Sequence, residues 1–161
     1  MTARPNRRAV CVGSALSALA ALLRAPAFAA EASRVRNDEA FNARSLDAAL
    51  KTLNLPTPID SDKIIIDAPD VAENGANVPV EITAKLFKAT RILVIAEKNL
   101  FPLLADVSLT PAGEAARVAP WIELKVKLAE TSRLRVFVEA DGTLYHAARS
   151  VRVIVGGCLP G

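Results

Sequence analysis

One cysteine near the C-terminal end is the residue with the most distinctive chemistry in this 161-residue chain. Cys158 follows two glycines, and the alternating valines of segment 151–155 predict a half-buried strand that ends at about Val155. Glycine has no Cβ and restricts the backbone little, so the sulfur could be carried on the order of 10 Å beyond Val155. Thiolates form and break sulfur–sulfur bonds, which makes Cys158 the candidate covalent attachment site. The predicted flexible arm around it comprises Gly156, Gly157, Leu159, Pro160 and Gly161.

The remaining residues offer little chemistry of their own. His146 is the only histidine, so no zinc or copper site of ordinary composition can be assembled within one chain. We interpret His146 as an ordinary half-exposed strand residue rather than a catalytic base, and Trp121 as a packing residue rather than a ligand contact. No two carboxylates form an evident catalytic pair, because they are scattered over separate segments. These carboxylates are Glu73, Glu81, Asp106 and Glu123. We therefore expect neither an enzyme nor a metal or other cofactor.

Residues 1–29 have the organisation of a cleaved export signal. The paired arginines Arg7 and Arg8 precede an apolar run from Val10 to Leu23, and Ala27-Phe28-Ala29 forms a small-x-small cleavage site. The arginine pair resembles a twin-arginine signal. At about 14 residues the apolar run is shorter than the ~20 needed to span a bilayer, so no permanent membrane anchor is predicted. After this signal, we predict that residues 30–161 form a single domain.

Removal of this signal changes both the charge and the cysteine count. The whole chain has a formal net charge of +3, but four of its 20 basic residues and none of its 17 acidic residues lie in segment 1–29. The remaining chain has 16 basic against 17 acidic residues, so its charge predicts no nucleic-acid or membrane partner. Cys11 is also removed, which leaves Cys158 alone. An odd cysteine in an exported protein indicates either an intermolecular disulfide or a reactive free thiol.

The sequence between the export signal and the thiol predicts mainly β-strands, which must position Cys158. One helix of about 16 residues is predicted around Ala43–Leu53, with Asn37 or Asp38 as its N-cap and Pro56 after its end. Asp141-Gly142 is a two-residue hairpin signal. Apolar runs and two-residue alternation then predict seven strands: 64–66, 78–86, 92–95, 105–109, 122–128, 134–138 and about 144–155. Seven short strands and one N-terminal helix indicate an immunoglobulin-like β-sandwich.

Several stretches resemble one family, the SoxY-type sulfur carrier proteins of thiosulfate oxidation. The stretches that carry the resemblance are Ala40-Phe41-Asn42-Ala43, the segment 69–80 with its Ala72-Glu73-Asn74-Gly75 loop, Glu130-Thr131-Ser132, Glu139-Ala140-Asp141-Gly142, and Gly156-Gly157-Cys158. The resemblance implies a periplasmic, non-catalytic carrier that forms a heterodimer with a SoxZ-like sandwich subunit. It also implies that Cys158 holds intermediates loaded by a c-type cytochrome and processed by a hydrolase. The chain departs from the family pattern after the cysteine, where Leu159 and Pro160 replace glycines.

A second interpretation from a different class stays open. The chain could be an exported structural or adhesive β-sandwich whose Cys158 forms an intermolecular disulfide. Adducts of sulfur or thiosulfate on the thiol would favour the carrier, whereas a stoichiometric disulfide dimer would favour the structural protein.

Overall fold

The computed structural model describes residues 36–110 and 117–157. The predicted export signal, Cys11 and the thiol-bearing segment 158–161 lie outside the described residues. The expectations for Cys158, Leu159, Pro160 and Gly161 are therefore not tested by this structure.

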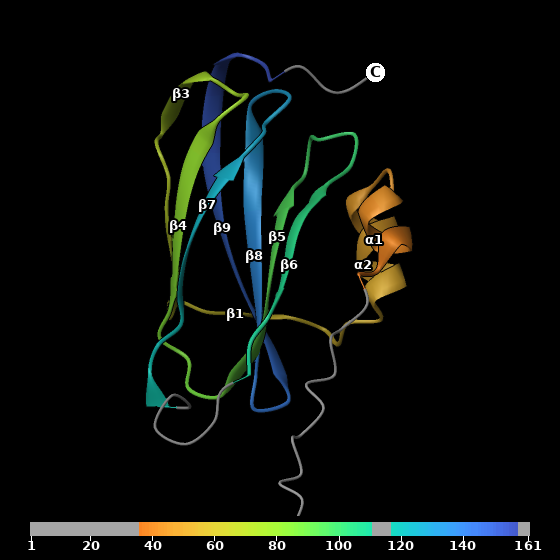
Figure 1. Ribbon diagram of the computed structural model, residues 1–161, viewed down its shortest axis with the longest axis vertical. Helices are drawn as coiled ribbons and strands as arrows, with labels where there is room; N and C mark the ends of the chain where they lie inside the picture. Colours follow the sequence, from red (N-terminus) through yellow and green to blue (C-terminus); the bar gives the residue numbers. More distant parts are fainter. Residues whose placement is uncertain (1–35, 111–116, 158–161) are drawn as a thin grey trace, which may run out of the picture. The chain divides into compact units, whose positions relative to one another are not determined.

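The described chain contains two β-sheets that stack face to face (Figure 1). The larger sheet has the strand order β1-β9-β8-β5-β6, with β3 also paired to β9, and the smaller sheet has the order β2-β4-β7. The strands are β1 (Ile59–Asp60), β2 (Ile64–Asp67), β3 (Val71–Asn74), β4 (Val78–Ala84), β5 (Ala89–Ala96), β6 (Leu103–Ser108), β7 (Trp121–Val126), β8 (Ser132–Ala140) and β9 (Thr143–Val155). The architecture is mainly β, as the alternation predicts.

Aliphatic side chains fill the space between the two sheets. Along β4, Val78, Val80 and Ile82 are buried while the residues between them face outward, which is the alternation expected of a strand with one face in the core. Ile92 and Val136 of the larger sheet belong to the same core. Each such side chain contributes about 1.5–3 kcal/mol on burial, so this core is the main source of stability.

All seven predicted strands are present, and two short strands occur that the sequence patterns did not predict. β1 and β3 each pair with β9 in parallel, with Asp60 opposite His146 and Val71 opposite Arg152. The hairpin prediction at Asp141-Gly142 is confirmed, because both residues have positive φ, 50° and 77°, as a type I′ turn requires. β9 therefore runs from that hairpin to the thiol end and makes contacts along its whole length.

The N-terminal helical segment differs from the predicted single helix of about 16 residues. It consists of α1 (Asp38–Asn42) and α2 (Leu46–Leu53). The Ser45 hydroxyl accepts a hydrogen bond from the backbone N–H of Ala48, and this N-cap starts a new helix where the pattern suggested continuation. Asn37 caps α1 through the N–H of Ala40, which confirms one of the two predicted caps.

The two helices cover part of the outer face of the larger sheet. A second hydrophobic cluster joins Ala40 and Leu53 of the helices to sheet residues that include Leu93, Phe137 and Leu144. The apolar stripe of the helical segment is thus buried within the chain. Over the described residues, no helix is long and apolar enough to cross a membrane.

Candidate functional site

The candidate site is the base of the predicted thiol arm, where β9 ends and Cys158 follows. Three segments of the described chain meet there: the turn after β3, the residues after β7, and the glycine pair after β9. Gly157 is the last described residue before the thiol. Its surroundings therefore determine where the arm leaves the domain.

Three backbone hydrogen bonds hold this junction together. The N–H of Gly75 donates to the carbonyl of Val155 at 2.7 Å, and the N–H of Leu128 donates to the carbonyl of Gly75 at 2.7 Å. The N–H of Gly157 then donates to the carbonyl of Leu128 at 2.9 Å. Each bond contributes about 0.5–1.5 kcal/mol, and together they extend backbone order past the last residue of β9.

The glycines at this junction are needed because the three backbones approach one another closely. A Cβ on Gly75 would lie 2.8 Å from the Gly157 nitrogen and would also run into the Leu128 carbonyl oxygen. A Cβ on Gly157 would lie 2.8 Å from the Gly75 carbonyl oxygen, and one on Gly156 would collide with Ala129. No other residue type fits without displacement of the neighbouring chain.

This geometry corrects part of the sequence interpretation. Strand β9 ends at Val155 as predicted, but the chain does not become free there, because Gly157 is buried and hydrogen-bonded. Gly156 and Gly157 provide close approach to neighbouring backbone rather than a free joint. The reach of about 10 Å counted from Val155 therefore does not apply, and any arm has to begin after Gly157.

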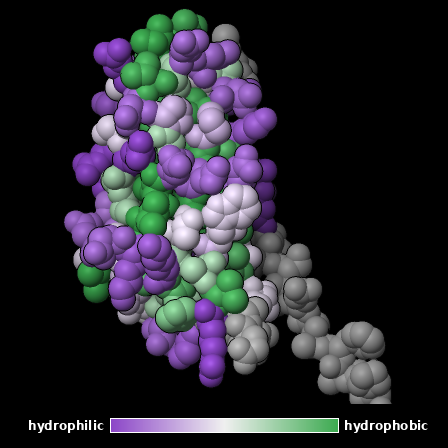
Figure 2. Space-filling view, turned by 90° about the vertical axis from the view of Figure 1, so that its left-hand side faces the viewer, coloured by the Kyte–Doolittle hydropathy of each residue, from purple (hydrophilic) through white to green (hydrophobic). Residues whose placement is uncertain are grey.

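Exposed hydrophobic side chains gather at the same end of the domain. Val71 of β3 and Ile154 and Val155 of β9 are 44%, 59% and 62% exposed. Figure 2 shows hydrophobic surface at the end where β3 and β9 finish. We call these three residues the apolar rim. Exposed apolar patches of this kind mark contact sites for other proteins.

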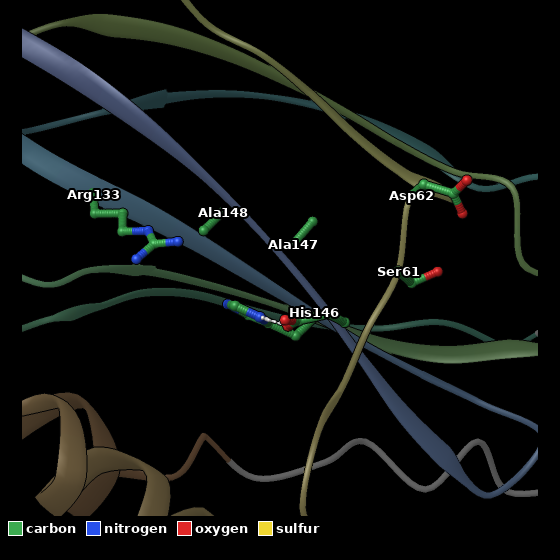
Figure 3. Close-up of a pocket in the computed structure, with 7 residues that line it drawn as sticks. Ser61, Asp62, Arg133, His146, Ala147 and Ala148 are labelled. Carbon is green, nitrogen blue, oxygen red and sulfur yellow. Dashed lines mark hydrogen bonds and ion pairs between the residues drawn. The ribbon is translucent and has the colours of Figure 1, made fainter.

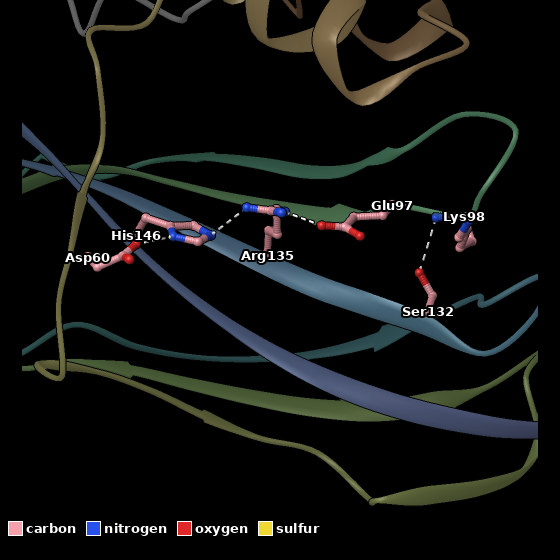
Figure 4. Close-up of polar contacts among 6 residues, drawn as sticks. All are labelled: Asp60, Glu97, Lys98, Ser132, Arg135 and His146. Atoms are coloured by element: carbon pink, nitrogen blue, oxygen red, sulfur yellow. Dashed lines mark hydrogen bonds and ion pairs between the residues drawn. The ribbon is translucent and has the colours of Figure 1, made fainter.

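A polar network lies on the outer face of the larger sheet (Figure 4). His146 Nδ1 lies 2.7 Å from Asp60 Oδ1, and His146 Nε2 lies 3.4 Å from Arg135 Nη1. Arg135 Nε donates to a carboxylate oxygen of Glu97. The prediction that His146 is half-exposed is wrong, because it is buried and lies against the Phe137 ring, with ring centroids 4.8 Å apart.

A cavity of about 440 Å³ opens beside this network (Figure 3). It is lined by Asp60, Ser61, Asp62, Arg133, His146, Ala147 and Ala148. His146 and Val155 lie on one extended strand and are separated by roughly 30 Å, so the cavity is remote from Gly157. Within the described residues, no group of His, Cys, Asp and Glu is arranged to hold a metal ion. Because of this distance, we assign the His146 network no role in positioning the thiol.

The hydrogen bond and the positive charge of His146 lower the pKa of Asp60 below its ordinary value. Such a carboxylate stabilises the fold above its unfolded pKa of about 4, and this contribution disappears as the pH falls through the lower folded pKa. We expect Asp60→Asn to be slightly less stable than the native chain at neutral pH and equally stable in strong acid. Thermal melts of both chains over a pH series measure this, and a difference that persists undiminished in strong acid would contradict it.

The other singled-out residues lie away from the thiol end or have partners of their own. Trp121, the first residue of β7, is 56% exposed, so the predicted packing role is wrong. Asp106 forms a two-bond ion pair with Arg91, at 2.7 and 2.6 Å, which raises the pKa of that arginine. Glu81 and Glu123 are directly opposite in the β4–β7 register, and no ion pair among the described residues involves either one.

Comparison with models of protein families identifies the family of this chain. The family model described as sulfur oxidation protein SoxY matches residues 50–158, a segment that spans the sandwich and ends on the cysteine itself. The chain belongs to the SoxY family. The tail residues Leu159, Pro160 and Gly161 lie beyond the matched segment.

One solved structure agrees with this SoxY assignment. The chain is 36% identical to a structure of the sulfur carrier protein SoxY from Chlorobium limicola f thiosulfatophilum, with a TM-score of 0.58 over 66% of this chain and 93% of that chain. A superoxide reductase (neelaredoxin) from Ignicoccus hospitalis is 16% identical, with a TM-score of 0.45 over 56% of this chain and 80% of that chain. The comparison with curated proteins gave no match.

Sequence reasoning found the glycine pair of this SoxY chain but missed the residues that receive it. Leu128 and Ala129 carry no side-chain chemistry and contribute only backbone groups: the N–H and carbonyl of Leu128 and the carbonyl of Ala129. The available signal was the joint occurrence of the Asn74-Gly75 turn and the terminal glycines. Two separate glycine positions that both need to lack a Cβ are consistent with one close contact between them.

Proposed function

We propose that this SoxY-family protein is a covalent sulfur carrier that holds intermediates of sulfur oxidation on the Cys158 thiol. The observation that carries the proposal is the anchoring of Gly157 at the end of the sandwich beside the apolar rim, since the next residue is the only thiol of the exported chain. The family match, which ends at Cys158, and the likeness to a solved sulfur carrier protein support it.

The proposed chemistry needs a thiolate and separate enzymes. The thiolate of Cys158 joins the outer sulfur of thiosulfate, and the two electrons released pass to a c-type cytochrome. A hydrolase then adds water to the terminal sulfonate, which leaves as sulfate, and a persulfide remains on the cysteine. The carrier contributes no catalytic group to these steps and supplies the accessible sulfur. The apolar rim offers each enzyme a common surface to bind while the thiol enters its active site.

Intact mass of the protein purified without reductant tests this function. The carrier predicts monomer masses increased by sulfur or by thiosulfate, and these increments disappear on reduction. The alternative, an exported structural sandwich, predicts a stoichiometric disulfide dimer and no adduct. A preparation that remains a free thiol after exposure to thiosulfate and a loading enzyme would defeat the carrier proposal.

We expect a SoxZ-like sandwich subunit as the main partner, in a heterodimer. The open sheet edges of the described domain are surfaces that a second sandwich could cover, and the apolar rim then stays available to the enzymes. Light scattering after size exclusion, with and without the candidate subunit, measures the expected one-to-one complex. A chain whose mass is unchanged by an excess of that subunit would contradict the expectation.

The proposed location is the periplasm, reached through the twin-arginine route. That route would let the chain fold before export and would let a partner without its own signal travel with it. Replacement of Arg7 and Arg8 by lysine is expected to leave unprocessed precursor in the cytoplasm, as cell fractionation and immunoblotting would show. Normal maturation of that variant would mean that another export route is sufficient.

A further inference from the structure

Strand β7 is an open edge of the smaller sheet. Its inner side pairs with β4, and among residues 36–110 and 117–157 no strand pairs with its other side. Open edges present unpaired N–H and C=O groups that favour association with another strand. The question is which strand the β7 edge fits.

The register identifies the outward backbone groups. The N–H of Ala84 donates to the carbonyl of Pro120, and bonded pairs recur at every second position of an antiparallel ladder. The even-numbered residues of β7 therefore bond to β4, and the odd-numbered residues direct their N–H and C=O groups outward. These outward residues are Trp121, Glu123 and Lys125.

The backbone groups along this edge are hydrogen-bonded at one point and have no described partner at another. Just beyond β7, the Asn99 side chain donates to the carbonyl of Lys127 at 2.8 Å and accepts from the N–H of Ala129 at 3.0 Å. Asn99 is buried and takes the place of a neighbouring strand there. No described residue does the same for Glu123 or Lys125. The open segment of β7 thus ends where Asn99 bonds the backbone at Lys127 and Ala129.

The side chains of this open segment form a self-complementary pattern. Glu123 and Lys125 lie on either side of Leu124, and both are exposed and without an ion pair among the described residues. If two copies pair antiparallel with Leu124 opposite itself, each Glu123 faces the Lys125 of the other copy. A shift of the register by two residues in either direction places Glu123 opposite itself or Lys125 opposite itself, and like charges directly opposite are destabilising.

We infer that β7 is the contact surface for a second copy of this chain, paired antiparallel about Leu124. The outward N–H and C=O groups of Glu123 and Lys125 then exchange backbone hydrogen bonds across the two-fold axis, and the two smaller sheets become one continuous sheet. The half-buried side chains of Ile122 and Leu124 gain cover from the same residues of the other copy. The arrangement also places a lysine beside Glu123, which otherwise faces Glu81.

Charge exchange in the full mature chain tests this inference. A Cys158→Ser background prevents disulfide dimers, so the result does not depend on the proposed carrier function. Sedimentation equilibrium is expected to give a reversible dimer that Glu123→Lys and Lys125→Glu each weaken by about tenfold or more, because each replaces two opposite-charge pairs by two like-charge pairs. The double exchange restores the opposite charges and is expected to restore the native dissociation constant to within a few-fold.

Two controls separate association from folding. Glu81→Lys makes the same charge change one strand further from the edge and is expected to leave the dimer within a few-fold of native. Glu123→Lys removes the like-charge pair with Glu81, so its melting temperature is expected to equal or exceed that of the native chain when both are measured at a concentration low enough for both to be monomers. A native chain that stays monomeric at the highest attainable concentration, or a dimer that both single exchanges leave intact, would overturn the inference.

Discussion

Replacement of Cys158 by serine is expected to abolish adduct formation completely while the domain remains folded. A hydroxyl is not ionised at neutral pH and does not displace sulfur from a sulfur–sulfur bond, whereas a thiolate does. Once the proposed export signal with Cys11 is removed, the chain has no second cysteine to substitute for it. Mass spectrometry after incubation with thiosulfate and a loading enzyme is expected to show loading of the native chain and none of the variant.

The fold should be unaffected by this change. The bonds that hold the end of β9 are backbone bonds of Gly75, Leu128, Val155 and Gly157, and none of them involves an atom of Cys158. The melting temperature of the variant is therefore expected to match that of the native chain, which serves as the control. Enzyme-dependent loading of the serine variant at the native rate would overturn the carrier mechanism.

The sheet structure of this chain could be predicted because its core strands follow a simple period. In β4 and β8 every second residue is buried, so the sequence pattern predicts both the strand and the face that it turns to the core. β5 is apolar on both faces and lies between β8 and β6, as a run of apolar residues predicts for a central strand. The hairpin before β9 follows from the backbone preference of Asp141-Gly142.

The two short parallel strands could not be predicted in the same way. β1 has two residues and β3 has four, which is too short for any period to be recognised. Both depend on β9, a strand distant in sequence that supplies their partners. The burial of His146 has the same origin, because Asp60 of β1 and the Phe137 ring are brought to it by tertiary structure.

The glycine pair before Cys158 has two possible physical explanations. A glycine pair before a cysteine suggests freedom, since glycine restricts the backbone least. The structure shows that the same glycines allow the chain to lie against the Gly75 turn and Leu128, where a Cβ would collide with neighbouring backbone. A carrier benefits from this arrangement, because an anchored base gives every partner enzyme the same starting geometry for the thiol.

Gly75→Ala is expected to destabilise the domain by about 2–4 kcal/mol. Forcing an added methyl into a filled space costs about 1–3 kcal/mol, and each backbone hydrogen bond that is displaced costs about 1 kcal/mol more. The methyl would meet the Leu128 carbonyl and the Gly157 nitrogen, which are backbone atoms held by the junction, and also a side-chain methyl group of Val153. Thermal or denaturant unfolding measures the loss, and amide exchange at Leu128 and Gly157 should accelerate.

Gly142→Ala is the matched control, because it makes the same chemical change where no heavy atom lies within 4 Å of the added carbon. Its φ of 77° means that alanine there costs about 1 kcal/mol of backbone strain, with no effect on the thiol end. The two variants therefore separate the cost of a glycine-type turn from the cost of close approach. If Gly75→Ala were no less stable than Gly142→Ala and left exchange at Gly157 unchanged, the anchored base of the arm would be refuted.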